Sequence, residues 1–434
     1  MADSLHFGVI GGTIWGNRGA EAMIATCVGY IRQVWPTAHV YVFSYSPRRD
    51  RQIVSVPNVI VADARPLALV LRLMPFSMLC YLAARVGLKI PDRCLPREVA
   101  ALRHCRLLLD VFGISFADGR AKFLPFNVLS VVPAMLLRVP VVKLSQALGP
   151  FRNPVNRILA RVTLKRCAHI FARGSITASY LKGLPLRPEQ FSVAGDLAFM
   201  YRDADSLSRE GESEVAALLD QLTEARVGGS RVIGISPSSV VYLKARRYRF
   251  DYIALLASLI QRALADGDHV VVLPNATRQG SNSLRNNDLP VIELLRSYCS
   301  TRLLAADFRR IHWFQSDVNT HGIRAIIAGT DILVTSRFHA MVAALAVSTP
   351  PLVIGWSHKY DEVLLSFGSA AASFDIGALD VESMLRRFDD MRHNTLRDDL
   401  HARNALTQMR HSSARQLDFL ASIIAADQRP QDRR

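Results

Sequence analysis

Short apolar runs alternate with amphipathic helical patterns along most of this 434-residue chain, and this alternation restricts the possible folds more than any other feature. The alternation forms two series, which are separated by a polar segment at residues 201–230. Strands that alternate with helices build parallel sheets through crossover connections. The sequence therefore predicts an α/β protein in which two Rossmann-like domains with parallel sheets face a cleft.

The two series give the following expected organisation. An N-terminal Rossmann-like domain spans 1–200 and carries an apolar insert at 66–90. The linker region, 201–230, contains a short helix. A C-terminal Rossmann-like domain spans 231–375, and charged helices follow at 376–426 before a frayed tail at 427–434. In open parallel sheets the ligand lies beyond the carboxyl ends of the strands, so the loops at those ends are the places to look for a site.

The chain is strongly basic, with a formal net charge of +16 at pH 7. Such a charge suits nucleic acid, an anionic membrane face or a small acidic ligand. No zinc finger, helix-turn-helix or aromatic RNA-binding motif is present in the sequence, so we expect no nucleic-acid partner. An acidic substrate and an anionic membrane both stay open. The oligomeric state is not readable from the sequence.

The six cysteines are scattered and never have CxxC spacing, which predicts neither a zinc site nor a disulfide framework. The N-terminus lacks the basic and apolar regions of a signal peptide, and we expect a cytoplasmic protein. Residues 66–90 are very apolar but are interrupted by Arg72, Pro75 and Arg85. They predict one or two helices that either pack into the domain or rest on the inner face of a membrane.

The segment Thr335-Ser336-Arg337-Phe338-His339 lies where a predicted strand ends and the next helix begins. A helix N-terminus attracts anions, and an arginine there can bind a phosphate or carboxylate with two parallel bonds. An imidazole two residues later can exchange protons near neutral pH. Arg337 and His339 are therefore the leading catalytic candidates, although an arginine paired with an acidic neighbour would give the same pattern.

A glycine-rich loop at 11–19 follows the first predicted strand. Glycines permit close backbone approach to a ligand, but the spacing matches neither GxGxxG nor a Walker A loop. No nicotinamide or ATP site is predicted, and no cofactor or metal is expected. Other strand-end positions add candidates for catalysis or substrate binding: Asp110, Arg173, Ser236, Asn275 and Lys359. Asp110 could equally be a buried structural carboxylate, because it lies in an apolar run.

Five stretches together resemble the polysaccharide pyruvyl transferase family over roughly residues 8–367. They are Gly16-Asn17-Arg-Gly19-Ala-Glu21-Ala22; Gln146-Ala-Leu-Gly149-Pro150-Phe151; Ala172-Arg173-Gly-Ser175 with Gly195-Asp196-Leu-Ala198-Phe199; Gly234-Ile-Ser236-Pro237 with His269 to Pro274; and Thr335 to Ala340 followed by Ile354-Gly355 and Lys359-Tyr360. One position departs from the family pattern. Ala20 stands where the family usually has Asp, which bears on the choice of acceptor and on activity.

The resemblance implies a GT-B-like fold with an acceptor-side N-terminal and a donor-side C-terminal domain. It implies phosphoenolpyruvate as donor and a pyruvate ketal on a sugar of a cell-surface glycan, or of its lipid-linked precursor, as product. The expected catalytic residues are His339, Arg337 and Asp110. The expected substrate-binding residues are Asn17, Gly19, Glu21, Arg173, Ser236, Asn275, Ser336 and Lys359.

Two other functions remain open at this point. A GT-B nucleotide-sugar glycosyltransferase would use the same two-domain architecture and similar cations. A non-catalytic protein bound to the membrane would account for the positive charge, the apolar 66–90 segment and Ala20. Stabilisation by a nucleotide sugar rather than by phosphoenolpyruvate would favour the first alternative.

Overall fold

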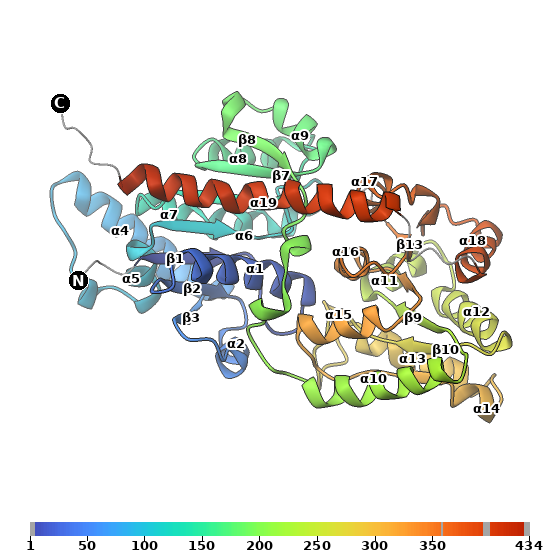
Figure 1. The fold of residues 1–434 in the computed structure, drawn as a ribbon. Coiled ribbons are helices and arrows are strands. Elements are labelled where there is room, and N and C mark those ends of the chain that lie inside the picture. Colours follow the sequence, from blue (N-terminus) through green and yellow to red (C-terminus); the bar gives the residue numbers. More distant parts are fainter. Residues whose placement is uncertain (1–4, 357–358, 394–399, 429–434) are drawn as a thin grey trace. The chain divides into compact units, whose positions relative to one another are not determined.

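The computed structural model describes residues 5–356, 359–393 and 400–428, and these form two compact units (Figure 1). Unit 1 comprises Met1–Trp15, Ala20–Ser208 and Met409–Arg434, and unit 2 comprises Gly16–Gly19 and Arg209–Gln408. The division after Ser208 lies inside the segment predicted as a linker, most of which is helix α10 (Glu212–Val227). The tail predicted at 427–434 lies outside the described residues from 429 onward.

Unit 1 is built on a parallel sheet in the order β3-β2-β1-β4-β6-β7-β8. Its strands are nearly continuous apolar runs, because helices cover both faces of a parallel sheet; the central strands are almost fully buried, whereas the edge strands expose Ile60 and Val193. The strands are β1 (His6–Ile10), β2 (His39–Ser44), β3 (Val59–Asp63), β4 (Leu107–Asp110), β6 (Val141–Leu148), β7 (His169–Arg173) and β8 (Phe191–Ala194), and the short β5 (Ile114–Ser115) pairs with β6.

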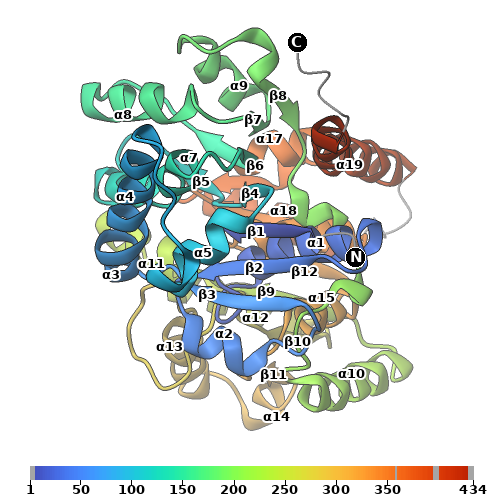
Figure 2. The same ribbon diagram turned by 90° about the vertical axis from the view of Figure 1, so that its left-hand side faces the viewer.

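Helices cover both faces of the unit 1 sheet. Figure 2 shows α1 (Arg18–Val34) and α19 (Leu400–Gln428) on one side, and α4, α7 and α8 on the other. Side chains from this second side form one core cluster beneath the sheet. The helices that complete unit 1 are α2 (Pro47–Ile53), α3 (Pro66–Ala68), α4 (Met74–Arg85), α5 (Arg97–His104), α6 (Leu124–Leu129), α7 (Val132–Leu136), α8 (Pro154–Leu164) and α9 (Ser175–Lys182).

Unit 2 repeats the plan with the sheet order β11-β10-β9-β12-β13-β14, again all parallel. This is the strand order of a doubly wound Rossmann domain. Its strands are β9 (Val232–Ser236), β10 (His269–Val272), β11 (Ile311–Trp313), β12 (Ile332–Thr335), β13 (Pro351–Gly355) and β14 (Ser373–Asp375). Besides α10, its helices are α11 (Ser239–Arg247), α12 (Tyr252–Ala265), α13 (Leu289–Ser300), α14 (Ala305–Phe308), α15 (Thr320–Ala328), α16 (Phe338–Ala346), α17 (Lys359–Ser366) and α18 (Val381–His393).

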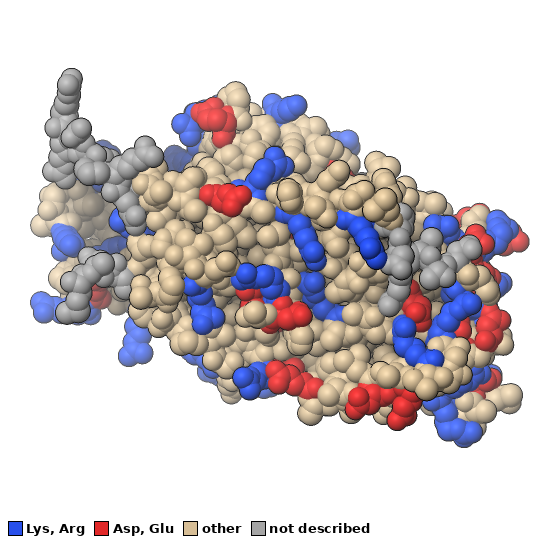
Figure 3. All heavy atoms as spheres, in the orientation of Figure 1, with Lys and Arg blue, Asp and Glu red and all other residues tan. Residues whose placement is uncertain are grey.

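The predicted fold class, two Rossmann-like domains with parallel sheets, is confirmed by these topologies. The apolar insert forms one continuous helical stretch, in which α3 and α4 are joined by a π-helical turn at Leu69–Leu73. Among the described residues, Pro66–Arg85 is the helical stretch whose length and apolar composition would suffice to cross a membrane. In the view of Figure 3, basic and acidic side chains are both distributed over the two units.

Candidate functional site

The topological switch point of the unit 2 sheet lies between β9 and β12, where the strand order reverses. Ligands of open α/β sheets bind beyond the carboxyl ends of the strands at such a point. The Thr335–Ala340 segment follows β12, and Ser236 ends β9 directly opposite Thr335. The sequence candidates of unit 2 therefore lie at the position where a Rossmann sheet binds its ligand.

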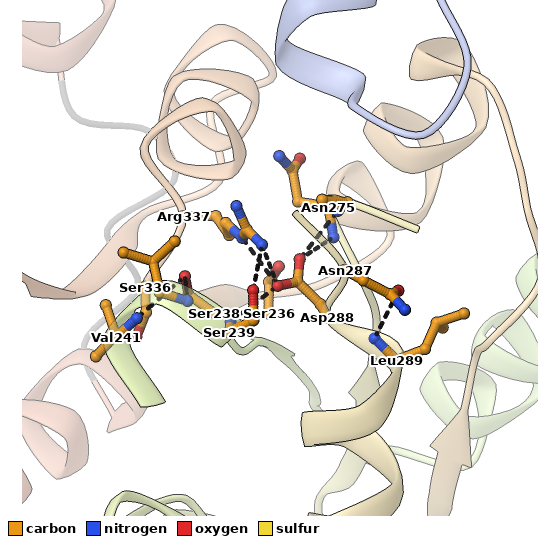
Figure 4. A network of polar contacts seen from close by, with 12 residues as sticks. Ser236, Ser238, Ser239, Val241, Asn275, Asn287, Asp288, Leu289, Ser336 and Arg337 are labelled. Atoms are coloured by element: carbon orange, nitrogen blue, oxygen red, sulfur yellow. Dashed lines mark hydrogen bonds and ion pairs between the residues drawn. The ribbon is translucent and has the colours of Figure 1, made fainter. Parts of the chain in front are cut away.

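Asp288 organises this edge of the sheet (Figure 4). It is fully buried at the start of α13. Its carboxylate accepts a hydrogen bond of 3.0 Å from Nε of Arg337 and another from Nη2 of the same guanidinium. The backbone N–H groups of Ser239, Asn275 and Ala276 also donate to it, at 3.0, 3.3 and 2.9 Å. One carboxylate thus ties together the loops that follow β9, β10 and β12.

Arg337 is held firmly by this network. Its Nη2 also donates to the hydroxyl of Ser239 at 3.1 Å, and its side chain is 13% exposed. Among the described residues, Nη1 takes part in no hydrogen bond or ion pair. The guanidinium therefore has an acidic partner within unit 2, as the alternative interpretation of the motif required, and retains one terminal nitrogen for another anion.

The two serines predicted to bind substrate are fixed through their backbones, and the hydroxyl of Ser336 is also hydrogen-bonded within the protein. The carbonyl of Ser236 accepts the N–H of Ser336 at 3.1 Å, and the hydroxyl of Ser336 accepts that of Tyr252 at 2.7 Å. Tyr360 donates to the Ser336 carbonyl at 3.2 Å. Burial raises the pKa of Tyr252, so its phenol stays protonated and continues to donate. These bonds fix the backbone that carries Arg337.

His339 is the second residue of α16 and lies against Gly19. A Cβ placed on Gly19 would come within 2.2 Å of Cγ of His339, so only glycine leaves room for this imidazole. Residues 16–19 are held in unit 2 by backbone bonds from Arg18 to Asn275 and from Thr277 to Gly16, both of 3.2 Å. The structure thus brings the Gly16–Gly19 loop, which includes Asn17, together with Asn275 and His339.

A second cation stands at the end of the neighbouring strand. Lys359 begins α17 just after β13, and its ammonium lies 4.9 Å from the ring centre of Phe338 and 5.2 Å from that of Trp356. Lys244 of α11 packs on Trp356 from 4.5 Å. Aromatic faces stabilise these ammonium groups without neutralising them. The carboxyl edge of the unit 2 sheet therefore places two ammonium groups on aromatic faces beside the positive end of the α16 dipole.

Asp110 lies at the switch point of unit 1, at the end of β4, and is buried in an ion pair. Its Oδ2 receives Nζ of the buried Lys143 at 2.5 Å, and Gln146 accepts from the same ammonium at 3.2 Å. Burial and the Asp110 charge raise the pKa of Tyr45 well above its usual value. Because Lys143 already neutralises its carboxylate, the geometry favours the structural interpretation of Asp110 over the catalytic one.

Arg173 and Glu21 also belong to unit 1. Arg173 ends β7 and binds Asp196 at 2.8 Å and the carbonyl of Gly113 at 3.1 Å, with only 6% of its side chain exposed. Glu21 is buried in the first turn of α1. Arg173 thus joins the ends of three chain segments. These contacts favour a structural role for Arg173 over the predicted role in substrate binding.

Sequence reasoning missed Asp288, the centre of the unit 2 network. An Asp that precedes Leu289-Pro290 at a helix start is typical of an N-cap, and this pattern was the available signal. In the structure its side chain makes no cap bond and turns toward Arg337. Within the described part of the chain, no group of three His, Cys, Asp or Glu residues is arranged to hold a metal ion.

Comparisons with known proteins agree with this architecture. A family model described as polysaccharide pyruvyl transferase matches residues 17–358. The amylovoran biosynthesis protein AmsJ of Erwinia amylovora is 20% identical over 404 residues, which cover 89% of this chain and 92% of AmsJ.

Solved structures with a similar fold include the UDP-GlcNAc 2-epimerase of Methanocaldococcus jannaschii, with a TM-score of 0.59, 12% identity and coverage of 96% of this chain and 100% of that one. A putative UDP-N-acetylglucosamine 2-epimerase from Listeria monocytogenes has a TM-score of 0.57 and 13% identity, with coverage of 100% and 99%. Anabaena Alr3699/HepE, solved in complex with UDP and glucose, has a TM-score of 0.54 and 13% identity, with coverage of 96% and 99%. At these identities the likeness concerns the fold.

Proposed function

The chain belongs to the polysaccharide pyruvyl transferase family, and on this premise we propose that it transfers the pyruvyl group of phosphoenolpyruvate to a sugar as a ketal. The observation that carries the proposal is the set of cationic groups at the carboxyl edge of the unit 2 sheet: Arg337, Lys359 and the N-terminus of α16. The relation to AmsJ supports a glycan of the exopolysaccharide class, or its lipid-linked precursor, as acceptor.

Each cationic group has a distinct part in donor binding. The Arg337–Asp288 pair carries no net charge, so its contribution is directional: Asp288 fixes the guanidinium plane and leaves Nη1 to bind a carboxylate or phosphate oxygen. The helix dipole adds attraction for the donor, and the ammonium of Lys359 adds a further hydrogen-bond donor for its phosphate. Asn275 adds a side-chain amide, which Figure 4 shows turned away from Asp288.

The proposed chemistry begins with protonation of the methylene carbon of phosphoenolpyruvate by His339, which makes that carbon a methyl group and the adjacent carbon electrophilic. The oxygen of one sugar hydroxyl bonds to the electrophilic carbon, which also carries the phosphate oxygen. The hydroxyl gives up its proton to His339, which restores the imidazolium. The bond from this carbon to the phosphate oxygen then breaks, and a second hydroxyl closes the ketal while its proton leaves with inorganic phosphate. Arg337 and Lys359 stabilise the departing phosphate.

Donor binding can be tested without knowing the acceptor. Phosphoenolpyruvate should raise the melting temperature of the full-length protein, because a ligand present at a hundred times its Kd adds about 2.7 kcal/mol of stability. Arg337→Lys keeps a positive charge beside Asp288 but loses the planar guanidinium that can bind Asp288 and the donor at the same time. It should therefore weaken this shift. His339→Gln should keep the shift and lose phosphate release with glycan acceptors. Arg296→Ala, an exposed change on α13, is the matched control.

Two results would count against the proposal. One is stabilisation by UDP-sugars with none by phosphoenolpyruvate, which would indicate a glycosyltransferase instead. The other is phosphate release by His339→Gln at the wild-type rate, which would remove the imidazole from the chemistry. The reaction product itself is identified by mass spectrometry as a glycan that has gained a pyruvate ketal.

A further inference from the structure

An apolar stripe runs along the exposed side of the helical stretch that begins at Pro66. Six of its side chains are between 49 and 73% exposed, at spacings that follow one face of a helix: Leu67, Val70, Leu71, Leu79, Leu82 and Val86. The π-helical turn at Leu69–Leu73 contributes to this alignment, because it shifts the helical register by one residue. Isolated apolar residues on a surface are ordinary, whereas a continuous stripe marks an interaction site.

The opposite side of this stretch is attached to unit 1. Leu69 and Leu73 are buried in the core cluster beneath the sheet. Arg72 forms ion pairs with Asp63 of β3 at 2.7 Å and with Glu98 of α5 at 2.9 Å. The stretch is therefore fixed along the surface by one face and exposes the other, which is the geometry of an interfacial helix.

Helix α8 exposes a second apolar stripe on the same side of the sheet (Figure 2). Its members are 50–61% exposed: Val155, Ile158 and Val162. The inner face of α8 contributes Ala160 and Leu164 to the same core cluster as Leu69 and Leu73. One layer of helices thus presents two apolar stripes to its surroundings.

The charge of this layer is predominantly positive, because its carboxylates are few: Asp63 and Glu98 pair with Arg72, and Asp118 accepts hydrogen bonds at the start of α8. Residues 64–91 and 119–188 contain no Asp or Glu, but they contain four and twelve Lys or Arg residues, respectively; two of the twelve, Lys143 and Arg173, are buried in ion pairs within the sheet. On α8 and just beyond it, Arg161, Lys165 and Arg166 line a surface hollow of about 320 Å³ together with Val162. Cationic groups therefore stand directly beside apolar side chains, a combination that matches an anionic lipid surface.

We propose that this helical face of unit 1, formed by Pro66–Val86 and α8, docks on the surface of an anionic bilayer. The apolar stripes enter the boundary between head groups and acyl chains, and the neighbouring arginines and lysines bind lipid phosphates. A second copy of the chain fits less well, because a symmetric interface would set this cationic face against itself. The inference goes beyond the proposed function, since lipid binding is measured without donor or acceptor.

The test is flotation of the purified full-length protein with phosphatidylcholine vesicles that contain or lack phosphatidylglycerol. Wild-type protein should float with the anionic vesicles, and less so as salt is raised. The variant Leu71→Gln/Leu79→Gln/Leu82→Gln should lower the partition coefficient at least about tenfold, because three half-exposed apolar side chains no longer insert. The variant Arg157→Ala/Arg161→Ala/Lys165→Ala should lower it by a similar factor at low salt.

Matched controls come from exposed positions of unit 2. Leu294→Gln/Leu304→Gln/Leu365→Gln and Arg285→Ala/Arg296→Ala/Arg309→Ala remove the same numbers of apolar and charged side chains and should float like wild type. Equal flotation with both kinds of vesicle, or wild-type flotation of both unit 1 variants, would overturn the proposal. So would a wild-type dimer in light scattering that the leucine variant converts to monomer, which would assign the stripe to a second copy. Thermal melting confirms that each variant is folded.

Discussion

Replacement of Asp288 by asparagine perturbs the centre of the unit 2 network while preserving its shape. Every hydrogen-bond partner of the carboxylate is a donor: two guanidinium nitrogens of Arg337 and three backbone N–H groups. An amide has one oxygen and one NH₂ group. In either orientation of the amide, the NH₂ group of the asparagine therefore faces donors and has no acceptor to bind. The variant also leaves the Arg337 charge without its buried partner.

The size of the effect follows from burial. Removal of one partner from a buried ion pair costs about 3–5 kcal/mol. Arg337 is 13% exposed and the amide keeps one acceptor, so we take the lower end, about 3 kcal/mol of the free energy of unfolding of unit 2. For a unit of this size, about 2–4 °C is lost per kcal/mol, which predicts a fall in Tm of about 6–12 °C.

Calorimetry is the appropriate assay, because a chain of two units need not unfold in one step. The transition of unit 2 should move and that of unit 1 should not. Asp307→Asn is the control: its ion pair with Arg310 is 2.7 Å long but lies at the surface, where such pairs contribute less than about 1 kcal/mol. If unit 2 of Asp288→Asn melted at the same temperature as unit 2 of the Asp307→Asn control, the reasoning that Asp288 holds Arg337 as a charged pair would be refuted.

Three further predictions concern other residues. Gly19→Ala should displace the His339 ring and lower turnover about a hundredfold in a phosphate-release assay. Gly87→Ala is the control for glycine loss: its added Cβ would meet nothing, and its positive φ should lower the melting temperature slightly but leave turnover unchanged. Lys143→Met should destabilise unit 1 by about 3–5 kcal/mol in calorimetry, because it leaves Asp110 charged and buried. Burial raises the pKa of Asp268 from 3.8 to about 6, so its protonated form stabilises unit 2 and that stability is lost as pH rises from about 4 to 6. Asp268→Asn should flatten the Tm profile in this window, and an unchanged profile would contradict the assignment.

Periodicity in the sequence was sufficient to predict the sheets and many of their helices. Apolar residues recur at helical spacing along Tyr252–Ala265 and Thr320–Ala328, and both segments are helices in the structure. The strand at Val59–Asp63 and the helix at Ser239–Arg247 were not predicted. The strand is short, and the helix carries three basic residues in its last turn. Neither therefore shows a clear periodic spacing of apolar residues, and both depend on tertiary packing.

The candidate site was predictable in position but not in its contacts. The end of a parallel strand is a property of local sequence, and it placed Arg337 and His339 correctly at the carboxyl edge of a sheet. The partner of Arg337 is 49 residues away, and that of Asp110 is 33 residues away. Such pairings depend on which loops the fold brings together, and no spacing in the sequence reports them. The sequence therefore left the roles of both residues open.

The absence of carboxylates from residues 119–188 has a consequence for how this surface responds to acid. Arginine and lysine keep their protons far above neutral pH, and only carboxylates and imidazoles titrate on the acidic side. The one imidazole in the segment, His169, is buried, and burial lowers its pKa. The positive charge that residues 119–188 contribute is thus almost constant from mildly acidic to mildly alkaline solution, so their attraction for anions should respond to ionic strength and hardly at all to pH.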